Sequence, residues 1–172
     1  MEIGRIESLR QATEKGEAEA QYQLAMLYIY GNDVEEDNAL AAQLLEKAAE
    51  QGHVEATYHL GICCHYGHGV EVNLKRACML YWTSAQCGYG KGMVLTARFY
   101  AEGIAVEQND DEAVKWYKKA TESGDVDAAA DAWNALSAMC RAGRGMEKDE
   151  KQAMKYLELA HNVRASARYV KR

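Results

Sequence analysis

The chain has no proline among its 172 residues, and its β-branched residues do not alternate with polar ones as they would in strands. Without proline, the turns must depend on other residues, and the 14 glycines are well suited to that role. Abundant alanine favours helices. Together these features predict an all-α chain.

Long apolar runs are also missing. The first 18 residues carry a charge every few positions, and no stretch of about 18 consecutive apolar residues occurs. Neither a secretory signal peptide nor a transmembrane helix is therefore predicted. The five cysteines are odd in number and lie mostly within apolar patterns, which favours reduced thiols in the cytoplasm. A cytoplasmic location is expected, and export by a signal-independent route is left open.

An excess of positive charge is absent as well. The chain holds 26 acidic and 20 basic residues, for a formal net charge of −6. Because acids and bases are interspersed, the charge pattern argues against a protein that binds nucleic acid by neutralising phosphates. No nucleic-acid or membrane partner is predicted.

The sequence repeats itself four times. Copies that begin at residues 20, 56 and 92 are offset by 36 residues, and a fourth begins at residue 132 after an offset of 40. The four extra residues fall in the alanine-rich stretch DVDAAADAW, so one added helical turn is predicted there. Residues 2–16 match only the second half of the unit and are predicted to form an N-terminal capping helix.

Each unit has the pattern of two helices joined by a turn. In the second copy, Ala56, Leu60 and Cys64 lie four apart on one face of the first helix, which Gly67 would end. Side chains that would cap the second helix stand at Asp37, Asn73, Asn109 and Asp149. One hairpin cannot bury both of its apolar stripes, so the hairpins are predicted to stack on their neighbours.

The repeated unit resembles the Sel1-like repeat, a relative of the tetratricopeptide repeat. In the second copy the resemblance is carried by Ala56, Leu60, Gly61, Gly67, Gly69, Val70, Ala77, Tyr81, Ala85 and Gly88. Asp33 and Ala105 depart from the pattern, because they replace the second glycine of the turn. The resemblance implies a right-handed α-solenoid of antiparallel helix hairpins, with four Sel1-like repeats and the N-terminal capping helix.

One solenoid domain is expected over residues 1–172. Its predicted parts are the capping helix at 1–17, repeats at 18–53, 54–89, 90–127 and 128–164, and a basic C-terminal tail at 165–172. Arg164 stands where the earlier units end in glycine, so the last helix is expected to run on into this tail.

The face opposite the first-helix core is expected to line a concave groove, as first helices do in tetratricopeptide-like stacks. This face is aromatic and apolar in the first two repeats and more charged in the later ones. The predicted partner-binding residues are Tyr22, Met26, Tyr30, Tyr58, Ile62, Tyr66, Arg98 and Arg141. A peptide or partner helix with an apolar end and a charged end would suit this groove. The alternative is that the aromatic side chains pack against the adjacent repeat.

Met79 and Trp82 break the pattern of the second helix. Their positions in the other copies hold Gln43, Lys115 and Lys155, and Glu46, Lys118 and Glu158. Three residues apart on one helical face, Met79 and Trp82 are predicted to form an apolar patch that serves as a second interface. A homodimer contact and a partner's anchor are both open, and the alternative is that a terminal segment covers the patch.

The stretch LGICCHYGHGV groups Cys63 and Cys64 with His65 and His68, in the manner of a metal or redox site. However, leucine, phenylalanine, methionine and tyrosine fill the cysteine positions in other copies, and consecutive side chains leave a helix about 100° apart. Packing is therefore predicted, with no metal or cofactor. Because no S-x-x-K, H-E-x-x-H or P-loop motif occurs, no catalytic residue is predicted.

These observations favour a non-enzymatic module that binds a protein or peptide in its concave groove, as an adaptor or scaffold. A bacterial toxin-neutralising (immunity) protein or a host-directed binding protein is the alternative. An enzyme or metal-binding protein is a further alternative, and a homodimer is left open.

Overall fold

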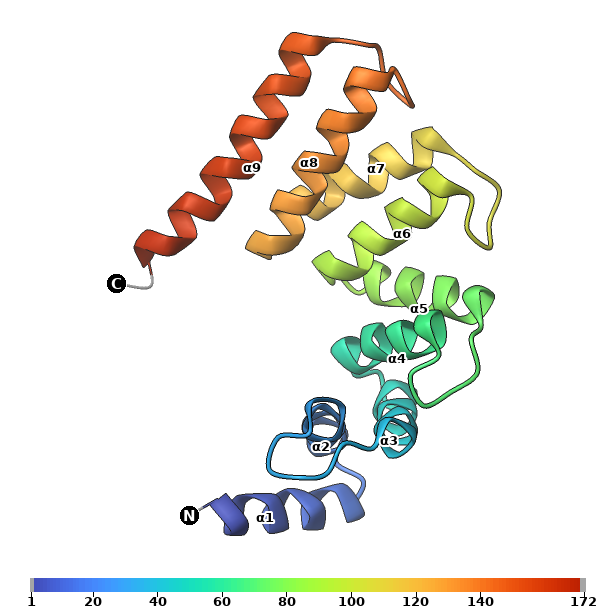
Figure 1. Cartoon of the computed structure of the whole chain (residues 1–172), viewed down its shortest axis with the longest axis vertical. Coiled ribbons are helices and arrows are strands. Elements are labelled where there is room, and N and C mark those ends of the chain that lie inside the picture. The colour runs from blue at the N-terminus through green and yellow to red at the C-terminus, as the bar shows by residue number, and fades with distance from the viewer. Residues whose placement is uncertain (1, 171–172) are drawn as a thin grey trace. The chain divides into compact units, whose positions relative to one another are not determined.

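A computed structural model describes the backbone of residues 2–170, which form nine helices and no strand (Figure 1). The helices are α1 Glu2–Glu14, α2 Ala18–Tyr30, α3 Asn38–Glu50, α4 Val54–Tyr66, α5 Leu74–Gln86, α6 Gly90–Glu102, α7 Asp110–Thr121, α8 Val126–Ala142 and α9 Glu150–Val170. The all-α prediction is confirmed for this part of the chain. Within the same residues, no helix is both long and apolar enough to cross a membrane.

The predicted capping residues do start the second helix of each hairpin. Side-chain oxygens of Asp37, Asn73, Asn109 and Asp149 accept hydrogen bonds of 2.9–3.0 Å from the backbone N–H three residues ahead. Each bond satisfies a donor that the start of a helix leaves without a backbone partner. The added turn in the fourth repeat is also present, because α8 has 17 residues whereas α2, α4 and α6 have 13 each.

One turn position has a left-handed backbone in all four repeats. The angle φ is 61° at Asp33, 70° at Gly69, 59° at Ala105 and 65° at Gly145. Glycine is required at Gly69, since a Cβ atom there would overlap the backbone carbonyl group of Asn38. Asp33 and Ala105 adopt the same backbone in spite of their side chains, at a cost in conformational free energy.

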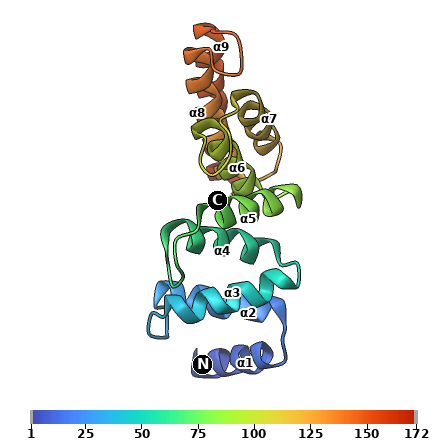
Figure 2. The ribbon, with the colours of Figure 1, turned by 90° about the vertical axis from the view of Figure 1, so that its right-hand side faces the viewer.

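The chain divides into two compact units, and the first comprises residues 1–80. In this unit α1 packs on α2, α2 on α3 and α3 on α4, and Figure 2 shows α3 in front of α2. Leu45 of α3 and Leu60 of α4 are fully buried in the core. An ion pair between Glu46 and Arg76 joins α3 to the first turn of α5.

The second unit comprises residues 81–172. Here α6 packs on α7 and α8, α7 on α8, and α8 on α9. The rings of Tyr81 and Phe99 meet edge to face, with their centroids 5.4 Å apart, and both are fully buried. Leu136 and Trp116 are buried in the same unit, which therefore has an apolar core of its own.

Both ends of the described chain are helical. The helix α1 occupies Glu2–Glu14 of the predicted capping helix. At the other end, residues 165–170 of the predicted basic tail continue α9. Residue 1 and residues 171–172 lie outside the described residues. The single solenoid domain over residues 1–172 stays a prediction.

Candidate functional site

Six of the predicted groove residues lie in the first unit, on α2 and α4. This aromatic strip consists of Tyr22, Met26, Tyr30, Tyr58, Ile62 and Tyr66. A spacing of four places each set of three along one helical face. Tyr30 and Tyr66, at the C-terminal ends of the two helices, are 63% and 56% exposed. The other four side chains are partly buried.

A cavity of about 320 Å³ opens beside the aromatic strip. Its walls are formed by Tyr30, Tyr58 and Ile62 of the strip together with Ile29, Glu36, Asn38, His59, Cys63 and His68. The structure thus brings three of the six predicted residues to one cavity, and Tyr22, Met26 and Tyr66 do not line it. Ligand pockets run from about 300 to 1,000 Å³, so this cavity suits one or two side chains of a partner.

Tyr22 packs against histidines of the next repeat. Its ring centroid lies 4.7 Å from that of His53 and 5.8 Å from that of His59. His59 also meets the ring of Tyr58 edge to face, at 5.2 Å. Burial, followed by the charge of Glu55, raises the pKa of Tyr22. For Tyr22 the packing alternative therefore holds, whereas Tyr30 and Tyr66 remain exposed.

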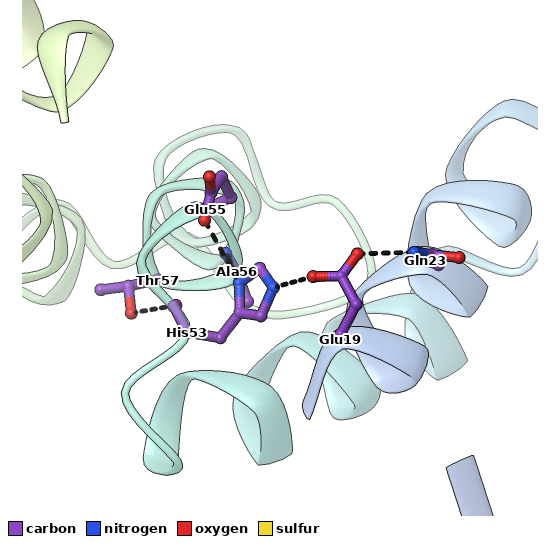
Figure 3. Close-up of polar contacts among 6 residues, drawn as sticks. All are labelled: Glu19, Gln23, His53, Glu55, Ala56 and Thr57. Carbon is purple, nitrogen blue, oxygen red and sulfur yellow. Dashed lines mark hydrogen bonds and ion pairs between the residues drawn. The ribbon is translucent and has the colours of Figure 1, made fainter. Parts of the chain in front are cut away.

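His53 joins α2 to the start of α4 (Figure 3). Its Nδ1 accepts a hydrogen bond from the Ala56 backbone N–H at 3.2 Å, and its Nε2 lies 3.0 Å from Glu19 Oε2. Because Nδ1 accepts, the neutral ring carries its proton on Nε2 and donates it to Glu19. Gln23 donates to the other Glu19 oxygen at 2.6 Å. The bonds from Gln23 and then His53 hold the pKa of Glu19 below its usual value.

His53 is not among the residues predicted from the sequence pattern. The corresponding residue is Glu17 before α2 and Tyr89 before α6, and neither caps its helix with its side chain. Asp125 does cap α8, by accepting from the Ala128 N–H at 2.9 Å. A side-chain acceptor at this position is thus the signal that could have identified His53 as a cap. Its bond to Glu19, 34 residues earlier, depends on how the repeats stack.

The aromatic strip lies in an acidic part of the chain. Residues 1–80 hold 13 acidic and 6 basic residues, whereas residues 81–172 hold 13 and 14. Neither α2 nor α4 contains lysine or arginine, and the turn that follows α2 carries Asp33, Glu35, Glu36 and Asp37. A partner with basic side chains would be attracted to this surface.

The predicted groove residues of the later repeats, Arg98 and Arg141, belong to the second unit. Both side chains are exposed. The Nε of Arg141 donates to Glu150 Oε1 at 3.0 Å, so Arg141 forms an ion pair with a residue of α9. Their part in a common groove with the aromatic strip stays a prediction.

The two residues predicted to form a second interface are exposed, as expected. Met79 has 70% of its surface accessible and Trp82 has 46%. That these residues form a second interface stays a prediction.

The cysteines of α4 are packing residues, as predicted. Cys63 and Cys64 are buried, and both are free thiols. Burial raises the pKa of Cys63 to about 11 and also raises that of Cys64, so neither thiol readily becomes a thiolate. Among the described residues, no three His, Cys, Asp or Glu side chains are placed to hold a metal ion.

Helix hairpins that recur along the chain and pack on their neighbours define a helical-repeat protein of the solenoid class. The family model of the Sel1 repeat matches residues 18–53, 54–89, 83–125 and 130–160, and the chain belongs to this family. The Sel1 repeat is generally a non-catalytic fold that mediates protein–protein interaction. The predicted family and solenoid fold are confirmed.

Solved structures support the same fold. A protective antigen of uropathogenic Escherichia coli with an SLR fold is 30% identical at a TM-score of 0.84, over 91% of this chain and 33% of that one. A Sel1 repeat protein from Oxalobacter formigenes is 30% identical at 0.76, over 85% and 58%. The chain thus spans only part of both proteins.

More distant matches agree in fold alone. An immunity protein of Pseudomonas aeruginosa is 20% identical at a TM-score of 0.51, over 92% of this chain and 73% of that one. The curated proteins contain no match to this chain.

Proposed function

We propose that this chain is a binding module that holds a segment of another protein on the aromatic strip of α2 and α4. The observation that carries the proposal is the pair of exposed tyrosines: Tyr30 lines the cavity, and the ring of Tyr66 lies 5.9 Å from that of His68 in the cavity wall. Large aromatic side chains next to a small cavity are typical of the energetic centres of protein interfaces. An apolar side chain of the partner would enter the cavity.

The charges around the strip favour a partner segment that also carries lysine or arginine. Glu36 is part of the cavity wall, and Glu55 lies on the same helix as Tyr58 and Ile62. Basic side chains on either side of an apolar anchor would pair with these carboxylates. Such pairs at the rim mainly raise the rate of association and the specificity.

An adaptor or scaffold role follows from this type of binding, because the proposed site holds a partner without transforming it. The free cysteines support a reducing compartment such as the cytoplasm. The likeness to an immunity protein is one of fold, so no toxin is proposed as the partner.

Selection from a random-peptide display library tests the proposal. Peptides selected on the unaltered chain should bind the Tyr30→Ala/Tyr66→Ala variant about tenfold more weakly, since two exposed anchors are lost. The control is Met154→Ala/Leu159→Ala, which removes two exposed apolar side chains of α9 and should leave affinity unchanged. Far-ultraviolet circular dichroism checks that all three proteins stay helical. Equal binding by the strip variant would exclude the strip as the site.

A further inference from the structure

We propose that a second cavity, built entirely from residues of the second unit, binds an acidic segment of a partner protein. This cavity of about 500 Å³ is lined by Trp82 and Gln86 of α5, by Tyr100 of α6 and by residues of α7. It is separate from the aromatic strip of α2 and α4, and its proposed ligand has the opposite charge.

An exposed tryptophan forms part of the wall. Trp82 is 46% exposed, and the corresponding position of the second helix is charged in every other repeat, as Glu46, Lys118 and Glu158. Trp116 contributes a second indole to the cavity, and Tyr100 contributes a phenol ring. Trp116 itself is only 6% exposed, so Trp82 and Tyr100 offer most of the apolar floor on which a side chain of a partner can lie.

The charged residues of the cavity make it positive. Lys115, Lys118 and Lys119 line it together with a single acidic residue, Glu112. Glu112 is occupied by Lys115, whose Nζ lies 2.6 Å from its Oε1. The Nζ of Lys119 lies 4.3 Å from the ring centroid of Trp116 and so stays over the cavity. In the described part of the chain, no ion pair involves Lys118 or Lys119.

Lysines next to aromatic rings favour a ligand that has a carboxylate beside an apolar side chain. Two lysines with no carboxylate partner lie beside aromatic rings, so an Asp or Glu can pair with an ammonium group while an adjacent apolar side chain contacts Trp82. Nucleic acid is disfavoured, because the same helix begins with Asp110 and Asp111 and is followed directly by Glu122. A long polyanion would meet these carboxylates on both sides of the lysines.

Fluorescence anisotropy with two labelled peptides tests the proposal. The first peptide has glutamates around a central tryptophan, and the second has lysines in place of the glutamates. On the Tyr30→Ala/Tyr66→Ala variant, which lacks the two exposed anchors of the aromatic strip, the glutamate peptide should bind and the lysine peptide should not, and binding should weaken with added salt as screening increases. A preference for the lysine peptide, or equal binding of both, would overturn the proposal.

Two matched variants locate the binding. Lys118→Glu/Lys119→Glu should weaken the glutamate peptide about tenfold, because two attractive contacts become repulsive. Lys151→Glu/Lys155→Glu makes the same change of charge at exposed positions of α9 and should leave affinity within about twofold. Trp82→Ala should weaken binding without a change of charge.

Other occupants give different results. If both lysine variants lose affinity equally, the peptide responds to overall charge and the site is excluded. If single-stranded DNA displaces the peptide at a lower concentration than a glutamate-rich competitor, the ligand is a nucleic acid and the proposal fails. If light scattering shows dimers that Lys118→Glu/Lys119→Glu abolishes, the occupant is a second copy. Because these measurements use the variant that lacks the exposed tyrosines of the aromatic strip, their failure leaves the proposed function standing.

Discussion

At the scale of single residues, the left-handed turn position costs conformational free energy in the two repeats that have Asp33 or Ala105 there. The other two repeats have glycine at this position and avoid that cost. Ala105 has a φ of 59° where Gly69 and Gly145 occupy the same position. A left-handed backbone costs a residue with a Cβ atom about 1–2 kcal/mol. Glycine removes that cost but loses more conformational entropy on folding, which offsets part of the gain.

Ala105→Gly is therefore expected to stabilise the protein. The free energy of unfolding should rise by about 0.5–1 kcal/mol, as measured by urea unfolding followed by circular dichroism. The control is Ala138→Gly, at an exposed position inside α8, which should lower stability by about 1 kcal/mol because the backbone there is helical. A loss of stability in Ala105→Gly similar to the control would contradict the argument.

The thiols should differ strongly in reactivity. Cys87 is exposed, whereas Cys63 is buried and has a pKa of about 11. Since the thiolate is the nucleophile, iodoacetamide at neutral pH should alkylate Cys87 first and should reach Cys63 and Cys64 only when the chain is unfolded. Peptide mass spectrometry after timed labelling measures the three rates. Equal rates in the native protein would show that α4 opens readily.

At the scale of elements, Arg144 links the turn between α8 and α9 to the hairpin of α6 and α7. Its Nε and Nη2 donate to the two carboxylate oxygens of Asp110 at 3.0 and 2.6 Å, and Nη2 also donates to the Ala101 carbonyl oxygen. One guanidinium thus joins the fourth repeat to the end of α6 and the start of α7. The hydrogen bonds from Arg144 hold the pKa of Asp110 below its usual value.

Arg144→Gln should lower the free energy of unfolding by about 1 kcal/mol at neutral pH, since both groups are partly exposed and the pair is screened. The lowered pKa of Asp110 fixes the sign of the pH dependence. The contribution of the pair is fully present above the unfolded pKa of aspartate, near 4, and is lost as pH falls through the lower folded value. The difference between the variant and the unaltered protein should therefore shrink below about pH 4.

The control for this prediction is Arg141→Gln. Arg141 makes a single ion-pair contact with Glu150, and both side chains are more exposed than Asp110. The control should cost less than about 0.5 kcal/mol at neutral pH. Thermal melts over a range of pH would measure both variants. An Arg144→Gln difference that stays constant down to acidic pH would show that the carboxylate of Asp110 is not the partner that matters.

Local features of the elements were predictable because their causes lie within a few residues. The cap at Asp37 reaches Leu40, three residues ahead, and the longer α8 follows from four added residues of high helix propensity. The surroundings of Tyr22 were not predictable. Its neighbours His53 and His59 come from the next repeat, so the packing depends on how α2 and α4 approach each other.

At the scale of the whole molecule, the two units differ in charge more than in fold. The first has more than twice as many acidic as basic residues, and the second is nearly balanced. The sequence pattern predicted one groove that turns from apolar to charged along the repeats. That groove stays a prediction, and the structure adds one cavity lined by residues of the aromatic strip in the first unit and another lined by lysines in the second. Side chains from different helices form each cavity, which a repeat alignment cannot reveal.

Local opening of the folded chain should also differ between the two units. In a repeat protein each unit is stabilised mainly by its neighbours, so damage to one core opens nearby helices before distant ones. Leu45 and Leu136 are fully buried, in the first and second unit respectively. Replacing either by alanine should cost about 2–5 kcal/mol locally. Leu45→Ala should speed amide hydrogen exchange in α2, α3 and α4 far more than in α8 and α9, as followed by mass spectrometry.

The reciprocal variant serves as the control, because Leu136→Ala makes the same chemical change in the other core. It should speed exchange in α8 and α9 while α2 and α3 stay protected. If both variants instead speed exchange equally along the whole chain, the nine helices of the described residues open as one cooperative block and the nearest-neighbour description is wrong. A local response would mean that a partner held on the aromatic strip stabilises α2 and α4 first, by linkage between binding and local opening.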